Sequence, residues 1–188
     1  MPQVLFVGGN TYFCALFSVI MKEVIISDET LRQAAQGGTA SFLRAVTDVV
    51  KESVDGELTA ETMQELNVHQ VTLWAFDILR EEVCEGGFVQ LIHNGYGPFF
   101  FQNPFARLMK DWGLRDLSKM MYAARDLYHV HGEALVADCT DDEFMALYEQ
   151  FPDFDDLDDE FVDREDEFAE SVAHYVDAHI EDFVKVES

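Results

Sequence analysis

Large apolar residues return every three or four positions along most of the chain, with polar residues between them. In the last stretch, Phe161, Phe168, Val172 and Val176 share one face at a period near 3.6 residues. We find no sustained alternation with a period of two, which a half-buried strand requires. The pattern therefore predicts an all-α protein, with residues 21–188 folded as a single compact helical domain that ends in acidic helices.

The residues between the apolar stripes predict where helices begin and end. Ser27, followed by two acids, predicts a helix N-terminus, and a second stripe covers residues 42–50. Thr59 is expected to cap a long helix that Gly86-Gly87 ends, and Thr140 opens a capping box with a short helix behind it. Further helices are expected at 88–92, 104–112, 117–128 and 158–184, with residues 99–101 as a buried connection.

Residues 1–20 are apolar and carry no Lys or Arg, but Gly-Gly-Asn-Thr interrupts them at positions 8–11. A secretory signal needs a positive start, and a transmembrane helix needs about 20 apolar residues. We expect neither, and no association with a membrane. The segment is either an N-terminal extension that packs on the domain or a start-site overcall with Met21 as the true start, and we favour the second.

The charge of the chain changes the picture of these helices. The 188 residues include 37 Asp and Glu against 12 Lys and Arg, a formal net charge of -25. The hydrophobic fraction of 48% is too high for a disordered chain, so the acids decorate a folded body. Residues 138–188 hold 20 of the acids and only 2 of the basic residues. This asymmetry predicts repulsion from nucleic acid and attraction to basic partners.

The densest acidic segment is residues 151–170, where 11 of 20 residues are Asp or Glu. Acids at the start of a helix stabilise it by about 0.3–1 kcal/mol each, and one or two satisfy that need. Twenty helical residues span about 30 Å, so the tract carries about one charge per 3 Å against one per about 1.7 Å in duplex DNA. A binding surface and imitation of DNA are therefore hypotheses beside a generic acidic surface. The candidate surface comprises Asp153, Asp155, Asp156, Asp158, Asp159, Glu160, Asp163, Glu165, Asp166, Glu167 and Glu170, with Asp141, Asp142 and Glu143 as an extension.

Local motifs for metal, phosphate or catalytic chemistry are incomplete. His129 and His131 diverge if they lie on a helix, and a calcium loop starting at Asp156 places Phe161 where the loop needs Gly. Neither phosphate-binding glycine motif occurs. The three cysteines match no disulfide or zinc spacing and are expected to be buried free thiols in a reducing cytoplasm. We expect no metal, no cofactor and no enzymatic activity.

The run FDILREEVCEGGFVQLIHNGYGPFFFQNPF at residues 76–105 contains a helix that ends in acids, then Gly86-Gly87-Phe88, Gln90 and Asn94. It resembles the signature of a bacterial family of small helical proteins of mostly unknown function. Residues 24–187, including EFVDREDEFAESVAHYV, resemble the acidic, dimeric DNA mimics within that family. The resemblance implies a homodimer whose acidic surface imitates the phosphates of double-stranded DNA. It also implies two partners, a helix-turn-helix transcription repressor and the histone-like protein HU, and regulation of transcription by blocking their DNA-binding faces.

Two rival functions stay open from the residues. An acidic module of the antitoxin or immunity type would neutralise a basic partner without imitating DNA. An enzyme would be built around Gln90, His93 and Asn94 in the glycine-rich turn. Competition with DNA separates the first rival from the DNA mimic, and substitution of the three turn residues tests the second.

Overall fold

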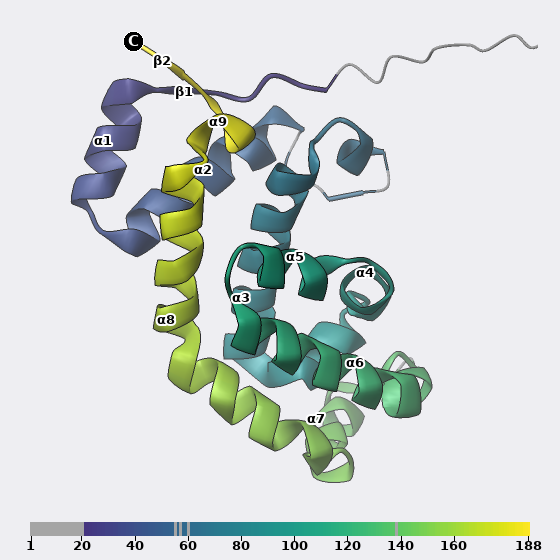
Figure 1. Cartoon of the computed structure of the whole chain (residues 1–188). Coiled ribbons are helices and arrows are strands. Elements are labelled where there is room, and N and C mark those ends of the chain that lie inside the picture. Colours follow the sequence, from purple (N-terminus) through teal and green to yellow (C-terminus); the bar gives the residue numbers. More distant parts are fainter. Residues whose placement is uncertain (1–20, 55, 57, 60, 138) are drawn as a thin grey trace, which may run out of the picture.

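A computed structural model describes residues 21–54, 56, 58–59, 61–137 and 139–188 of the chain (Figure 1). The expectations for residues 1–20, including Cys14, lie outside the described residues. The described chain is mainly helical with almost no strand, which confirms the prediction of an all-α fold in a single compact domain. In chain order its elements are β1 (Ile25–Ser27), α1 (Asp28–Gln36), α2 (Thr39–Ser53), the 3₁₀ turn η1 (Thr62–Gln64), α3 (Val68–His93), α4 (Gly97–Gln102), α5 (Phe105–Asp111), α6 (Arg115–Leu135), α7 (Asp141–Gln150), the 3₁₀ turn η2 (Pro152–Phe154), α8 (Asp155–Ala178), α9 (Ile180–Phe183) and β2 (Lys185–Glu187).

Side-chain caps begin several of these helices. Ser27 caps α1 as predicted, because its hydroxyl accepts the Thr30 backbone N–H at 3.0 Å. The expected long helix starts later than predicted. The Thr59 hydroxyl holds only the short η1 turn, and Asn67 and Gln70 form the capping box that begins α3. A threonine that matches a cap in sequence therefore caps only a short turn here, while the stronger reciprocal cap begins the helix.

The long helices α3 and α8 pack against each other and against α2 and α6. Leu79, Phe88 and Ile92 of α3 are fully buried, as are Phe161 and Val172 of α8. The rings of Phe88 and Phe161 meet edge to face with their centroids 6.5 Å apart. Burial of each such side chain contributes about 1.5–3 kcal/mol, so this contact is central to the core.

A kink divides α3 at Gly86 and Gly87. Gly86 has φ -153° and ψ 24°, and Gly87 has φ 69°, neither of which is helical. The sequence predicted a helix end at this pair and a short helix after it, and the structure has both. The chain nevertheless continues with little interruption, so the second half of α3, up to His93, begins directly behind the kink. A positive φ at Gly87 is a conformation that glycine adopts readily.

Two other predicted segments differ from the structure. Residues 99–101 lie in the short helix α4 rather than in a connection, because Pro98 in its first turn favours helical backbone. The predicted helix 158–184 begins at Asp155 and breaks at His179, whose φ of -132° ends α8 before α9. The chain then leaves the helix and pairs with β1, a contact that no local pattern signals.

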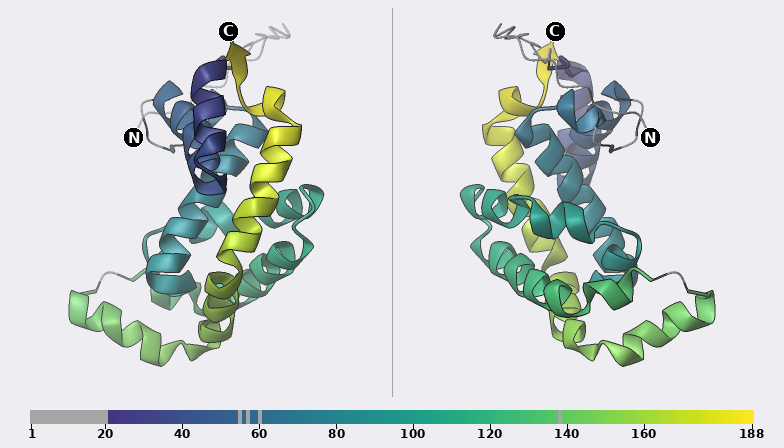
Figure 2. Two further views of the ribbon diagram at one scale, coloured as in Figure 1. Left: turned by 90° about the vertical axis from the view of Figure 1, so that its left-hand side faces the viewer. Right: turned by 90° about the vertical axis from the view of Figure 1, so that its right-hand side faces the viewer.

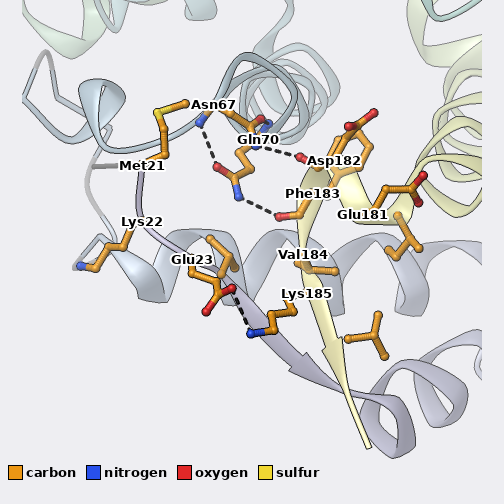
Figure 3. Close-up of a pocket in the computed structure, with 13 residues that line it drawn as sticks. Met21, Lys22, Glu23, Asn67, Gln70, Glu181, Asp182, Phe183, Val184 and Lys185 are labelled. Carbon is orange, nitrogen blue, oxygen red and sulfur yellow. Dashed lines mark hydrogen bonds and ion pairs between the residues drawn. The ribbon is translucent and has the colours of Figure 1, made fainter. Parts of the chain in front are cut away.

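The two ends of the described chain meet at the N-terminus of α3 (Figure 3). Asn67 Nδ2 donates to the carbonyl of Asp182 at 2.8 Å, and Gln70 Nε2 donates to the carbonyl of Phe183 at 2.8 Å. β2 then pairs in parallel with β1 along three residues. The same residues that cap α3 therefore also fix the chain that follows α8.

The acidic helices lie at the other end of the molecule. In Figures 1 and 2, α7 and the first turns of α8 lie at the end opposite the β1–β2 pair, and α7 projects from the body. Cys84 and Cys139 are free but exposed, which corrects the expectation of buried thiols. Within the described part of the chain, no helix is both long enough and apolar enough to cross a membrane.

Candidate functional site: an acidic interaction surface

The helix α8 presents its apolar residues to the core and most of its acids to solvent. Phe154 in η2, with Phe161, Phe168 and Val176 in α8, is buried, and Leu157 is half-buried. These residues recur at helical spacing, so one face of α8 is held against α3, α2 and α6. The opposite face of a helix about 36 Å long is thereby held rigidly in solvent.

Five acids form a line along that outer face, which we call the acidic stripe. Each helical residue advances by about 100°, so spacings of four, four, three and four residues keep all five within a sector of about 80°. All five side chains are exposed. The first four have no ion-pair partner among the residues that the structure describes, and Glu170 lies 3.8 Å from His174 Nε2. The acidic stripe consists of Asp155, Asp159, Asp163, Asp166 and Glu170.

Arg164 neutralises a neighbouring part of the predicted surface. Its guanidinium donates to both carboxylate oxygens of Glu167, at 3.0 and 2.8 Å, and to Glu160 at 3.2 Å. A fourth bond reaches Asp116 of α6 at 3.2 Å. The hydrogen bond from Arg164 lowers the pKa of the Glu167 carboxyl. Glu160 and Glu167 are therefore exposed but internally paired. The sequence analysis missed this grouping, although spacings of three and four residues from Arg164 signal it.

Asp158 does not lie on the outer face, which corrects the expectation that all eleven acids do. Its Oδ1 accepts the backbone N–H of Phe88 at 2.8 Å, directly behind the α3 kink. Burial raises the pKa of Asp158 to about 6, and the nearby carboxylates of Asp155 and Asp159 act in the same direction. Its position on the helix explains this, because it precedes the buried Phe161 by three residues and so shares its side.

Glu165 is also turned inward, because it follows the buried Phe161 by four residues. It forms an ion pair with Arg80 of α3, and the two side chains are only 17% and 24% exposed. The helical spacing was the signal that would have separated these two acids from the stripe.

The remaining predicted acids lie near the α6, α7 and η2 segments. Asp153 lies 3.2 Å from His131 Nε2, and Asp156 and Asp142 are exposed. Glu143 closes the predicted capping box by accepting the backbone N–H of Thr140 at 2.8 Å, and this bond lowers the pKa of the Glu143 carboxyl. Asp141 is the first residue of α7. The structure thus places Glu143 in a local structural role, Asp156 beside the stripe on α8, and Asp142 in the first turn of α7.

The Gly-Gly-Phe segment positions the acidic helices. Tyr148 of α7 donates its hydroxyl proton to the carbonyl of Gly86 at 3.0 Å, while Asp158 accepts from Phe88. A Cβ atom on Gly87 would lie 2.3 Å from Asp158 Oδ2, so only glycine permits this approach. The kink therefore forms hydrogen bonds that hold both α7 and α8 in place.

The residues proposed for an enzyme have structural partners. Asn94 Nδ2 donates to Glu82 Oε2 at 2.8 Å, and Gln90 Nε2 donates to the same oxygen at 3.2 Å. His93 Nδ1 lies 2.9 Å from the carbonyl of Leu135. Among the described residues, no group of three or more His, Cys, Asp or Glu side chains has the arrangement of a metal site. Through these contacts Gln90, His93 and Asn94 stabilise the C-terminal segment of α3.

The chain is similar to a known protein family and to a protein of that family. Residues 64–179, from η1 through the whole acidic stripe, match the family model of DMP19-like proteins. The DNA mimic protein DMP19 of Neisseria meningitidis serogroup B is 35% identical over 136 residues, covering 69% of this chain and 82% of that protein. The residues that the family model matches include both the Gly-Gly-Phe segment and the acidic stripe.

Proposed function

The chain belongs to the DMP19-like protein family, and from this premise we propose that it acts as a DNA mimic. Its acidic stripe occupies the DNA-binding face of a basic protein and excludes double-stranded DNA from that face. The observation that carries the proposal is the line of four exposed carboxylates along α8 that have no ion-pair partner among the described residues. The protein acts by competitive binding and performs no chemical step.

The stripe imitates the linear arrangement of DNA phosphates, although its carboxylates are less closely spaced than the phosphates of one strand. From Asp155 to Glu170 the helix rises about 22 Å, which gives one stripe carboxylate per about 5–6 Å. One strand of duplex DNA carries a phosphate per about 3.4 Å. Asp156 and the paired Glu160 and Glu167 add charge beside the line. Lysine and arginine side chains that reach successive phosphates therefore meet carboxylates in a line whose spacing is of the same order, but wider.

The partners that fit this surface are proteins whose DNA contacts are electrostatic. We propose a helix-turn-helix transcription repressor and the histone-like protein HU, so that blocking the repressor changes transcription. The chain itself avoids nucleic acid because its net charge of -25 repels phosphates. We further propose a cytoplasmic homodimer, which presents two stripes to one partner, and sedimentation equilibrium tests the dimer.

The decisive experiment is competition for a labelled DNA duplex bound to purified HU or to the repressor. The variant Asp159→Asn/Asp163→Asn/Asp166→Asn removes three stripe charges from the middle of α8. It should lose most of its ability to displace DNA while remaining at least as stable as the wild type, because it relieves repulsion between acids three and four residues apart. Displacement by the wild type should also weaken as salt rises, since exposed charges are screened beyond about 8 Å at 0.15 M.

A matched control removes the same charge elsewhere. Asp48→Asn/Glu52→Gln/Glu61→Gln changes three exposed acids outside α7 and α8 and should displace DNA as the wild type does. If the stripe variant still displaces DNA like this control, imitation of DNA is refuted. If the protein binds a basic partner while that partner keeps its DNA, the antitoxin-type alternative is supported instead. Replacement of Gln90, His93 and Asn94 should leave partner binding unchanged. That result would argue against the alternative in which these three residues form an active site.

A further inference from the structure

A groove of about 310 Å³ lies beside the C-terminal half of α8, between that helix and the α1–α2 hairpin. Residues of α8 form one wall, and residues from the end of α1 to the start of α2 form the other. Glu170 belongs both to the acidic stripe and to the wall of the groove. The groove therefore opens where the stripe ends.

Apolar atoms line the inner part of this groove. The residues Phe42 and Ala173 are only 7% and 9% exposed. Ala35, Gly38 and Ala173 leave the space open because their side chains end at Cβ or are missing. Gly38 has φ +91°, and nothing lies within 4 Å of a Cβ built there. The local backbone and the small side chains together keep the groove empty of protein atoms.

Carboxylates stand at the rim of the same groove. Asp177 follows Glu170 by seven residues, or about two helical turns, so it continues the line of the stripe. It is exposed and has no ion-pair partner in the described part of the chain. His174 lies between the two acids on this wall. The sequence analysis ended the acidic surface at Glu170 and did not include Asp177.

We infer that this groove receives one long basic side chain, arginine or lysine, of the protein that the stripe binds. The inference rests on the proposed function and extends it to a specific subsite. The aliphatic stem of such a side chain favours apolar surface while its charged head stays at the polar edge. Two carboxylates at the rim offer charge-assisted hydrogen bonds to that head.

The opposite wall carries the N-terminus of α2, which has no side-chain cap. A helix N-terminus resembles about half a positive charge, whereas each rim carboxylate carries a full negative charge. The charged head therefore turns toward α8, and the groove does not suit a phosphate. A basic side chain seated there also fixes the register of the partner along the stripe, which an exposed row of charges alone does not.

The direct test uses a small probe that needs no protein partner. In NMR spectra, N-acetyl-argininamide should shift the methyl signals of Ala35 and Ala173, and the neutral analogue N-acetyl-citrullinamide should not. Asp177→Asn should reduce the shift, whereas Asp48→Asn, the same change at an exposed site on α2, should retain it. Equal shifts with both compounds, or none with the arginine compound, overturn the inference.

The second test fills the groove without changing its charge. Ala35→Leu should weaken binding to HU by about tenfold, the scale of losing one well-packed contact. Ala40→Leu adds the same atoms to an exposed site on α2 outside the groove and should not. Asp177→Asn should cost less affinity in the Ala35→Leu background than alone, because both changes act on one subsite.

The outcomes separate this inference from the proposed function. If Ala35→Leu and Asp177→Asn bind HU normally while the Asp159/Asp163/Asp166 variant does not, the groove inference is wrong and the DNA mimic stands. If that stripe variant displaces DNA as the wild type does, the DNA mimic is wrong. If the protein does not bind HU at all, the NMR test with N-acetyl-argininamide still determines whether the groove binds an arginine side chain.

Discussion

Asp158 gives the sharpest prediction, because it is the predicted surface acid that the fold buries against the α3 kink. Its pKa of about 6 lies above the ordinary aspartate value of 3.8. The folded state therefore binds this proton more tightly than the unfolded state. The stabilisation that the protonated carboxyl provides is fully present below about pH 4 and is lost as pH rises through about 6. Above that pH the fold bears the cost of holding a partly desolvated carboxylate.

The size of the effect follows from the shift. Two pKa units correspond to about 3 kcal/mol, and partial solvent exposure of the carboxyl reduces this to about 1–2 kcal/mol. Asp158→Asn keeps an oxygen that accepts the Phe88 N–H and removes the charge. We therefore expect the variant to be more stable than the wild type at pH 8, with that advantage shrinking by about 1 kcal/mol at pH 5.

The assay is urea unfolding followed by circular dichroism at four pH values from 5 to 8, with ΔG taken by linear extrapolation. Asp163→Asn is the control, since it makes the same change of charge at an exposed position of α8 one turn further from Asp158. A constant difference between Asp158→Asn and the wild type across this range would refute the reasoning. Asp158→Ala separates the two roles, because it leaves the Phe88 N–H without its acceptor and should cost about 1–3 kcal/mol.

Three further changes test other parts of the structure. Gly87→Ala should destabilise the protein by about 2–4 kcal/mol in urea unfolding, because the residue has a positive φ and its new Cβ clashes with Asp158. Gly113→Ala is the control, since Gly113 also has a positive φ but open space around it. It should cost only the strain of the backbone conformation, about 1–2 kcal/mol. Arg164→Gln should lower the free energy of unfolding by at most about 1 kcal/mol. It should tighten binding to HU, measured by calorimetry, because it frees the carboxylates of Glu160 and Glu167 from their ion pairs. Weaker binding would contradict this pairing. Glu165→Gln should cost about 1–3 kcal/mol, because the partly buried Arg80 loses its charged partner. DNA displacement should be unchanged once the variant is folded.

Local patterns predicted much of the fold. The helical periods placed most helices, and Ser27 and Thr140 cap helices as expected because a cap depends on a few consecutive residues. Thr59 shows the limit of that reasoning. A matching residue type does not decide between a helix and a turn when Asn67 offers a stronger cap eight residues later. The β1–β2 pair was missed because three-residue strands at opposite ends of the chain carry no periodic signal.

The sequence by itself determined that the protein is helical and that its negative charge gathers near the C-terminus, because periodicity and charge are properties of neighbouring residues. Only the tertiary structure decided what each of these acids contacts. Asp158 and Asp159 are adjacent and chemically identical, yet one binds the α3 kink seventy residues away and the other joins the stripe. Likewise, Arg164 pairs with Asp116 of α6, and Asp177 borders a groove that α1 and α2 complete. Exposure depends on what packs against each side of a helix, and those contacts come from distant parts of the chain.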